Sequence, residues 1–109
     1  MTKQDLDKIF ELAHKLDIED PNEALIFHER IFEPLYDAIQ NSDITTIEYL
    51  ENCKLSDRDI AATIIEDAIV ENNIVSEGVT QVGYERVVGL FRLVCEENGW
   101  NADEILREG

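Results

Sequence analysis

Two residues of this chain, Glu11 and His14, are spaced so that their side chains could bind a metal ion together. On a helix, positions three apart project from one face, and carboxylate-bridged metal centres in helical bundles use Glu-x-x-His pairs of this kind. Such a centre needs a second pair and two more glutamates on other helices. The sequence contains one pair, and His28 lacks the spacing. We therefore expect no metal and no cofactor, and a metal-dependent enzyme built on Glu11 and His14 is a third-ranked hypothesis.

The sequence carries no recognisable signature for other catalytic chemistry. Gly78 and Gly83 are not followed by Gly-Lys-Ser or Gly-Lys-Thr, so a phosphate loop is not indicated. The acids do not alternate as they do in a calcium-binding loop, and Cys53 and Cys95 match no zinc or redox spacing. We expect two reduced thiols and no enzyme, although a catalytic triad that assembles only in space leaves no such pattern in one sequence.

Carboxylates dominate the chain, because 25 Asp and Glu stand against 9 Lys and Arg and give a formal net charge of −16 on 109 residues. The acids are also unbalanced locally: the stretches from Arg30 to Lys54 and from Arg58 to Arg86 each enclose acids and no base. A chain of this charge repels nucleic acid and anionic membranes and attracts cationic surfaces. We therefore expect a basic protein as partner, with no nucleic acid and no membrane. The alternative is that the acids only keep the protein in solution.

The base-free segment between Arg58 and Arg86 is the predicted partner-binding site. Asp67 and Glu71 stand four residues apart, where like charges on a helix repel by roughly 0.2–0.5 kcal/mol, and a basic partner would relieve that repulsion. Charges mainly supply association rate, whereas apolar anchors hold a complex together. The predicted charge-pairing residues are Asp59, Glu66, Asp67, Glu71 and Glu77, and the predicted anchors are Val70 and Tyr84.

Helical periodicity with local start signals predicts the elements of the N-terminal half. Thr2 can cap a first helix of about 15 residues. Asp20, Pro21 and Glu23 mark the start of a second helix. Pro34 is predicted to break or kink that helix and to leave a short continuation, because proline lacks a backbone donor. The predicted apolar stripe of the second helix holds Leu25, Ile26, Ile31 and Phe32.

The most regular helical pattern lies in the middle of the chain. A polar break at 41–43 precedes a third helix that ends near Cys53. Ser56, with Asp59 three residues later, has the form of a capping box that opens the next helix. Its predicted inner face holds Ile60, Ala61, Ile64, Ile65, Ala68 and Ile69, and its opposite face holds Asp59, Thr63, Glu66, Asp67 and Val70. An apolar residue among acids is either covered by the following loop or offered to a partner.

The C-terminal part of the chain begins with its least helical segment, residues 73–83, which we predict to be a loop, with a short hairpin as the alternative. A long helix from Tyr84 follows and stops at Asn98-Gly99, where glycine permits a left-handed residue. Asn101 is predicted to cap a short terminal helix, with Trp100 packed against its first turns.

No segment shows the clean alternation of a strand, so we predict an all-α fold. The chain has no linker or low-complexity stretch that would divide it. We predict a single compact domain over residues 1–109, with five to seven helices joined by short loops.

Residues 34–50 resemble one ankyrin unit. The sequence PLYDAIQNSDITTIEYL stands where that unit has Pro-Leu-His, then Ala, then Asn-Gly-Asp and a second helix ending in Leu. Tyr36 replaces the family's histidine and Ser42 its glycine, and no second Pro-Leu pair follows at the repeat spacing of about 33 residues. Residues 84–101 look like a degenerate second helix of such a unit. The resemblance implies a helical adaptor that binds a peptide or a partner helix.

The size, acidity and helical character of the chain resemble those of the immunity proteins that neutralise bacteriocin and contact-dependent inhibition toxins. Many of those toxins are basic nucleases that hold phosphate, and their inhibitors place carboxylates where phosphates would lie. Phage-encoded nucleic-acid mimics share this logic. The resemblance implies an antitoxin-like inhibitor that binds and blocks a basic toxin nuclease domain.

Four hypotheses therefore stay open: an immunity-type inhibitor, an adaptor, a phage-type nucleic-acid mimic, and the metal-dependent enzyme. The adaptor would use an apolar groove, which we expect near Phe27, Phe32, Tyr36 and Tyr49, and its binding would depend weakly on salt. The N-terminal residues lack a hydrophobic stretch beside a basic one, and the apolar runs are short. We therefore expect neither a signal peptide nor a membrane span, and a cytoplasmic protein.

Overall fold

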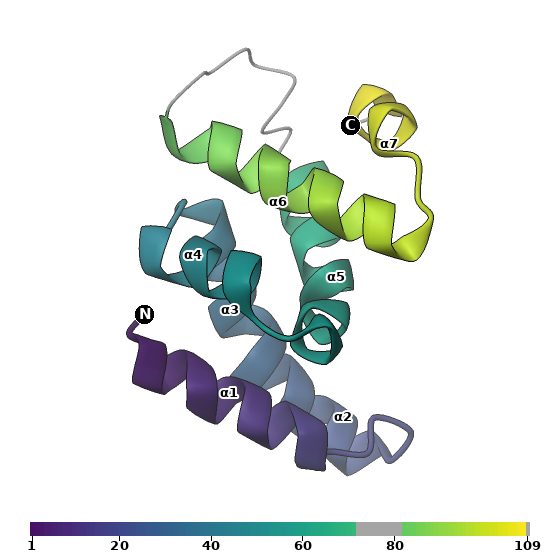
Figure 1. Cartoon of the computed structure of the whole chain (residues 1–109). Helices are drawn as coiled ribbons and strands as arrows, with labels where there is room; N and C mark the ends of the chain where they lie inside the picture. The colour runs from purple at the N-terminus through teal and green to yellow at the C-terminus, as the bar shows by residue number, and fades with distance from the viewer. Residues whose placement is uncertain (72–81, 109) are drawn as a thin grey trace.

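All regular structure is helical in the computed structural model, which describes residues 1–71 and 82–108 (Figure 1). The elements are α1 (Lys3–Lys15), α2 (Pro21–Phe27), the π-helical turn η1 (His28–Phe32), α3 (Glu33–Gln40), α4 (Ile44–Asn52), α5 (Leu55–Glu71), α6 (Val82–Asn98) and α7 (Ala102–Glu108). Because α2, η1 and α3 follow one another without a break, the described residues form six helices. The predicted all-α fold is confirmed.

Helix α1 begins where the sequence predicts, at a complete capping box. The Thr2 hydroxyl oxygen accepts from the Asp5 backbone N–H at 3.1 Å, and the Thr2 N–H donates to the Asp5 carboxylate at 3.2 Å. Hydrogen bonds that the Asp5 carboxylate accepts from Thr2, first among them the one from the Thr2 N–H, hold the pKa of Asp5 below its ordinary value. The helix buries Leu6, Phe10 and Ala13 as one stripe.

Pro34 does not break its helix, because the preceding turn widens. The Glu33 N–H bonds to the His28 carbonyl five residues back, which makes η1 a π turn. A wider turn accommodates a residue that has no N–H to donate and whose ring clashes with an α-helical carbonyl. The helix therefore continues from Pro21 to Gln40, and Ile31, Leu35 and Ile39 on it are buried.

The expected inward position of Leu25 and Ile26 is wrong. Leu25 is 57% exposed and Ile26 38% exposed, and α2 contains no buried residue. The main neighbour of α2 is η1, the next turn of the same helix. The first turns of this helix therefore extend beyond the core, and periodicity alone could not show where the core ends.

The predicted capping box at Ser56 is also wrong. Helix α5 begins at Leu55, and the N–H groups of Asp57 and Arg58 both bond to the Lys54 carbonyl, at 3.1 and 3.0 Å. Ser56 thus lies inside the first turn. By contrast, Asp43 caps α4 as the polar break implies: its carboxylate accepts from the Thr46 N–H at 3.3 Å.

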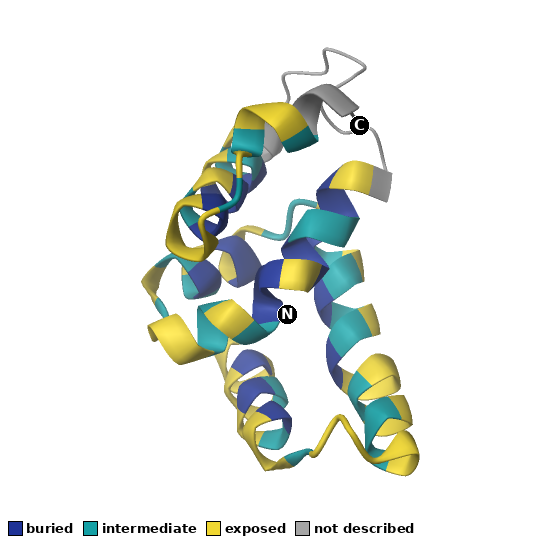
Figure 2. Cartoon of the chain, turned by 90° about the vertical axis from the view of Figure 1, so that its right-hand side faces the viewer, coloured by how far each residue is buried: buried dark blue, intermediate teal, exposed yellow. Residues whose placement is uncertain are grey.

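The helices form a layered stack, with α1 and α6 on opposite sides of α3, α4 and α5 (Figure 1). Buried residues line the faces that the layers turn toward one another (Figure 2). The α1–α4 contact includes stacked rings of Phe10 and Tyr49, whose centroids are 5.6 Å apart, and a hydrogen bond from Tyr49 Oη to Asp7 at 2.8 Å. Each fully buried aliphatic or aromatic side chain contributes about 1.5–3 kcal/mol.

Helix α5 carries the predicted inner face: Ala61, Ile64, Ile65, Ala68 and Ile69 are buried, and Ile60 is partly buried. Ala62 is buried as well, because α5 packs against both α3 and α6. The loop predicted for residues 73–83 lies mostly outside the described residues, and α6 begins at Val82, before the predicted start at Tyr84.

The end of α6 and the start of α7 follow the predicted signals. Gly99 has a φ of +71°, in the left-handed region that favours glycine. The Asn101 side chain accepts from the Glu104 N–H at 3.1 Å and caps α7. Trp100 and Ile105 are both partly buried against the core, which positions α7 beside α6. No helix in the described ranges has both the length and the apolar character needed to cross a bilayer.

Candidate functional site

A line of accessible residues runs along α5, between the sides that face its neighbouring helices. Asp59 and Thr63 are exposed, Glu66 is half-buried and Val70 is 36% exposed. Their spacing of four, three and four residues places them on one helix face. We call Asp59, Thr63, Glu66 and Val70 the α5 stripe. It brings together three of the residues that the sequence predicts for partner binding.

The other predicted site residues are not members of the α5 stripe: Asp67 lies beside it, and the side chains of the remaining residues are not described by the structure. Asp67 is half-buried on the flank of the α5 stripe, about 100° around the helix from Glu66. Glu71 ends α5 and Tyr84 lies in the first turn of α6, but the side chains of both lie outside the described part of the structure, as does all of Glu77. Their part in the site stays a prediction.

The carboxylates of the α5 stripe are not neutralised by the arginines nearest in sequence. Arg58, Arg86 and Arg92 instead pair with Glu97, with Glu48 and Glu51, and with Asp103. Asp59 and Glu66 form no ion pair with any base of the described residues. Asp59 and Glu66 therefore keep their negative charge, while these three arginines are engaged by other carboxylates.

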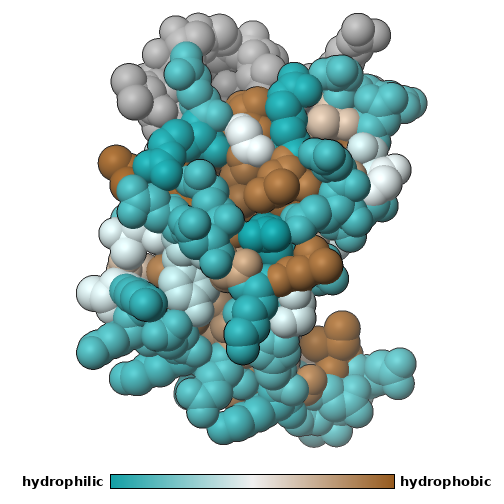
Figure 3. Space-filling view, viewed as in Figure 1, coloured by the Kyte–Doolittle hydropathy of each residue, from teal (hydrophilic) through white to brown (hydrophobic). Residues whose placement is uncertain are grey.

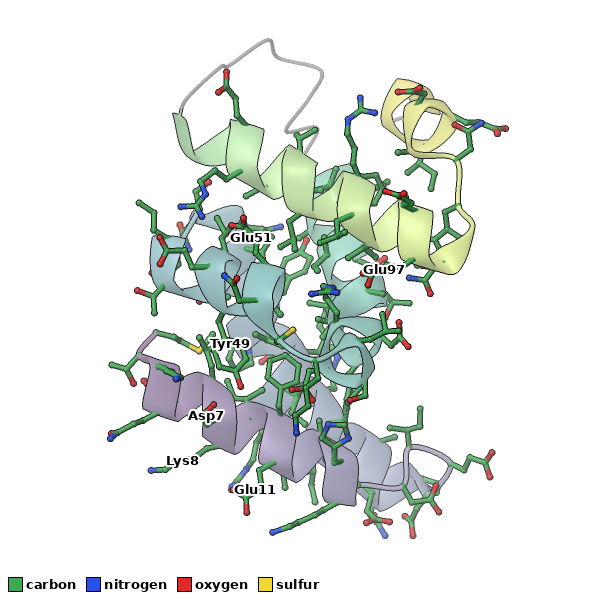
Figure 4. All side chains as sticks on the ribbon, in the orientation of Figure 1. Asp7, Lys8, Glu11, Tyr49, Glu51 and Glu97 are labelled. Atoms are coloured by element: carbon green, nitrogen blue, oxygen red, sulfur yellow. The ribbon has the colours of Figure 1, made fainter. Side chains whose placement is uncertain are left out.

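Arg58 is the most strongly held of these arginines. Its Nε and Nη2 donate to the two carboxylate oxygens of Glu97 at 2.8 and 2.7 Å, which joins α5 to α6 (Figure 4). Its Nη1 also donates to the backbone carbonyls of Leu50, Glu51 and Cys53, at the end of α4. The hydrogen bonds to Glu97 raise the pKa of Arg58, and the same pairing lowers the pKa of Glu97.

Arg86 pairs with two acids, Glu48 and Glu51, of the base-free segment between Arg30 and Lys54. Its guanidinium lies 3.3 Å from the Glu48 carboxylate and 2.7 Å from that of Glu51, and both hydrogen bonds raise its pKa. These acids come from α4 and the arginine from α6, so the pairing could not be read from the sequence order.

Glu66 lies close enough to α6 to act on a buried thiol. Burial raises the pKa of the Cys95 thiol, and the negative charge of Glu66 raises it further. A thiol held protonated in the core is a poor nucleophile. Burial likewise raises the pKa of Cys53, and both cysteines are free.

The face shown in Figure 3 is predominantly hydrophilic, with its apolar area divided into separate patches. The large apolar side chains that are exposed in the described residues are Ile18, Leu25, Ile26, Ile44, Leu55 and Val70. Because Val70 is the member of this set on the acidic α5 stripe, it is the apolar contact that the predicted site retains.

Glu11 and His14 do not converge on a shared site. Glu11 is exposed and accepts from Lys15 at 3.2 Å, whereas His14 Nε2 lies 2.5 Å from the Asp57 carboxylate. Within the described ranges, no three His, Cys, Asp or Glu side chains are grouped so that they could hold a metal ion. The hypothesis of a metal-dependent enzyme on Glu11 and His14 required both to face other carboxylates inside a bundle, and it is wrong.

The four aromatic residues expected to form one groove are divided. Tyr49 lines a hollow of about 510 Å³ together with residues of α1, α4 and the start of α5, including Lys3, Lys54 and Asp57. Burial raises the pKa of Tyr49, and its hydrogen bond to Asp7 adds to this effect. Phe32 and Tyr36 line a different hollow, and the two hollows share no lining residue.

The sequence predicted Phe32 and Tyr36 for an apolar groove, but it did not indicate the other residues of this second hollow. The hollow is lined by His28, Phe32 and Tyr36, whose rings stack in a row, and by Glu33 and Asp37. The available signal for His28 was the spacing of aromatic rings at i, i+4 and i+8, since such positions lie near one another on a helix.

Comparison with protein-family models, with curated proteins and with solved structures finds no match to this chain. The arrangement of the α5 stripe and of the two hollows is therefore the basis for inferring a function.

Proposed function

We propose that this protein is an immunity-type inhibitor that binds and blocks a basic partner protein, a toxin nuclease domain, through the α5 stripe. The observation that carries this proposal is that Asp59 and Glu66 form no ion pair with a base of the described residues, while Arg58, Arg86 and Arg92 pair with other carboxylates. Leaving a line of like charges uncompensated destabilises the free protein and favours a complex in which a cationic surface covers it.

A nuclease domain fits this surface because such an enzyme must itself hold phosphate groups with basic side chains. Carboxylates presented at a spacing fixed by a helix can occupy those positions. Val70 offers an apolar contact within the same stripe. The charges would then increase the association rate, while desolvation of Val70 and of groups around it would slow dissociation.

The function is tested by stoichiometric inhibition. The partner is obtained as the basic protein that immobilised wild-type chain retains from cells producing both, and its nuclease activity is titrated with the free protein. We expect activity to fall in proportion to the added inhibitor and to vanish near one equivalent. The double variant Asp59→Lys/Glu66→Lys should need a large excess.

The matched control reverses two exposed acids that lie outside α5, Glu19→Lys/Glu96→Lys, and so changes the net charge by the same amount. It should inhibit nearly as well as the wild type. If both double variants lose inhibition equally, the α5 stripe is not the binding surface. If the retained protein has no nuclease activity, the inhibitor proposal fails in its present form.

A further inference from the structure

Three stacked aromatic rings follow one another along η1 and α3. The ring centroids of His28 and Phe32 are 5.3 Å apart with planes 20° from parallel, and those of Phe32 and Tyr36 are 5.6 Å apart with planes 17° from parallel. Phe32 and Tyr36 are half-buried, and His28 is exposed. We call these three residues the aromatic row.

The aromatic row spans the π turn that precedes Pro34. His28 and Phe32 are the first and last residues of that turn. Phe32 and Tyr36 stack at nearly the same separation across the start of α3. Side chains four residues apart on a helix are neighbours, so this spacing brings the three rings together.

Carboxylates border the aromatic row. The three rings, Glu33 and Asp37 together line a hollow of about 590 Å³. Glu33 lies 3.5 Å from His28 Nε2, and both side chains are more than half exposed. Asp37 is exposed and forms no ion pair with a base of the described residues. The hollow therefore combines aromatic surface with negative charge.

We propose that this hollow binds the side chain of an arginine on an exposed segment of a partner protein. A guanidinium is planar, so it can stack on an aromatic ring while its N–H groups donate to carboxylates at the edge of that ring. An apolar side chain would leave Glu33 and Asp37 without a partner. A second copy of this chain is disfavoured as the occupant, because each copy carries a net charge of −16.

This site goes beyond the proposed function. It lies on η1 and α3, uses none of the α5 stripe, and recognises a side chain that occurs in many kinds of protein. It can therefore exist whether or not the α5 stripe binds a toxin.

The test is an NMR titration of the isotopically labelled full chain with the blocked tripeptide acetyl-Gly-Arg-Gly-amide. Peptides with Lys or Gln in the central position serve as comparisons. We expect saturable shifts centred on the ring signals of Phe32 and Tyr36, with affinity in the order Arg, Lys, Gln. Shifts spread evenly over the acidic helices, or equal affinity for Arg and Gln, would overturn the proposal.

Variants separate the two parts of the site. Phe32→Leu should weaken binding of the arginine peptide about two- to fivefold, through loss of the cation–ring contact. Glu33→Gln/Asp37→Asn should weaken it further, and both side chains are exposed, so the fold should be kept. The control Glu19→Gln/Glu96→Gln removes the same charge elsewhere and should bind as the wild type does. If the control loses as much affinity as Glu33→Gln/Asp37→Asn, only the overall charge attracts the peptide and the site is refuted.

Discussion

Arg58 shows how one side chain can hold three elements of this protein together. Its guanidinium covers backbone carbonyls at the end of α4 and forms a two-pronged contact with Glu97 of α6, while its own backbone belongs to α5. The Arg58 and Glu97 side chains are only 14% and 18% exposed. Both side chains are less exposed than those of the Arg92–Asp103 pair, so we expect the Arg58–Glu97 pair to contribute more than an ordinary surface ion pair does.

We expect Arg58→Met to lower the free energy of unfolding by about 2–3 kcal/mol, because it leaves carbonyl oxygens and the Glu97 carboxylate without their donor. Urea denaturation followed by circular dichroism measures the loss. The comparison is Arg92→Met, whose pair with Asp103 is 53% and 69% exposed. That variant should lose less than about 1 kcal/mol. Equal losses for the two variants would show that Arg58 has no special structural role.

The same pair predicts a pH dependence. Arg58 holds the pKa of Glu97 below its ordinary value. A carboxylate with a lowered folded-state pKa stabilises the fold above its unfolded pKa of about 4.3, and this stabilisation is lost as the pH falls through the folded value. The destabilisation caused by Glu97→Gln, measured by urea denaturation, should be full at pH 7 and should shrink below about pH 4. In a protein that already carries Arg58→Met, the destabilisation caused by Glu97→Gln should be about the same at pH 7 and below pH 4.

At the scale of the elements, local signals predicted the helix boundaries well wherever one residue fixes one hydrogen bond. Thr2, Asp43 and Asn101 all act as caps, because their side chains need only a backbone N–H two or three residues away. The prediction failed at Ser56, where Arg58 and the end of α4 define the corner, and at Leu25, where the core ends. Those outcomes depend on contacts between segments distant in sequence.

Two glycines give opposite predictions for one kind of substitution. Gly99→Ala should cost about 1 kcal/mol, since the residue has a φ of +71° that an L side chain rarely adopts. Gly89→Ala should stabilise the protein by about 0.5–1 kcal/mol, because Gly89 lies within α6. At both positions an added Cβ meets no atom within 4 Å, so only the backbone terms differ. Thermal unfolding of both variants gives the comparison, and shifts of the same sign would contradict it.

At the scale of the whole molecule, the sequence predicted the charge but not its arrangement. The counts alone indicated an acidic surface, and the base-free segment pointed to α5. The sequence could not show that Arg86 crosses from α6 to Glu48 and Glu51, or that Asp59 and Glu66 are among the acids that form no ion pair with a base of the described residues. The spacing of His28, Phe32 and Tyr36 was visible in the sequence, but the π turn from His28 to Phe32 and the continuation of the helix past Pro34 were not.

The net charge of −16 predicts that added salt stabilises the protein. Repulsion among the acids should exceed the attraction within the ion pairs, and salt screens both. Raising NaCl from about 20 to 300 mM should therefore raise the midpoint of thermal unfolding, by roughly 2–6 °C for a domain of this size. A fall of the midpoint with salt would mean that pairs such as Arg58–Glu97 outweigh the repulsion. That result would remove the argument that the α5 stripe is strained in the free protein.

The most direct test of the account is the association rate constant with the basic partner, measured by stopped flow as a function of ionic strength. The wild type should associate fast at low salt, with a rate that falls steeply as salt is added. Asp59→Lys/Glu66→Lys should slow association at low salt by about tenfold or more and flatten its salt dependence, whereas Glu19→Lys/Glu96→Lys should change it far less. The same rate for the wild type and the α5 variant at low salt would contradict the claim that the α5 stripe is the docking surface.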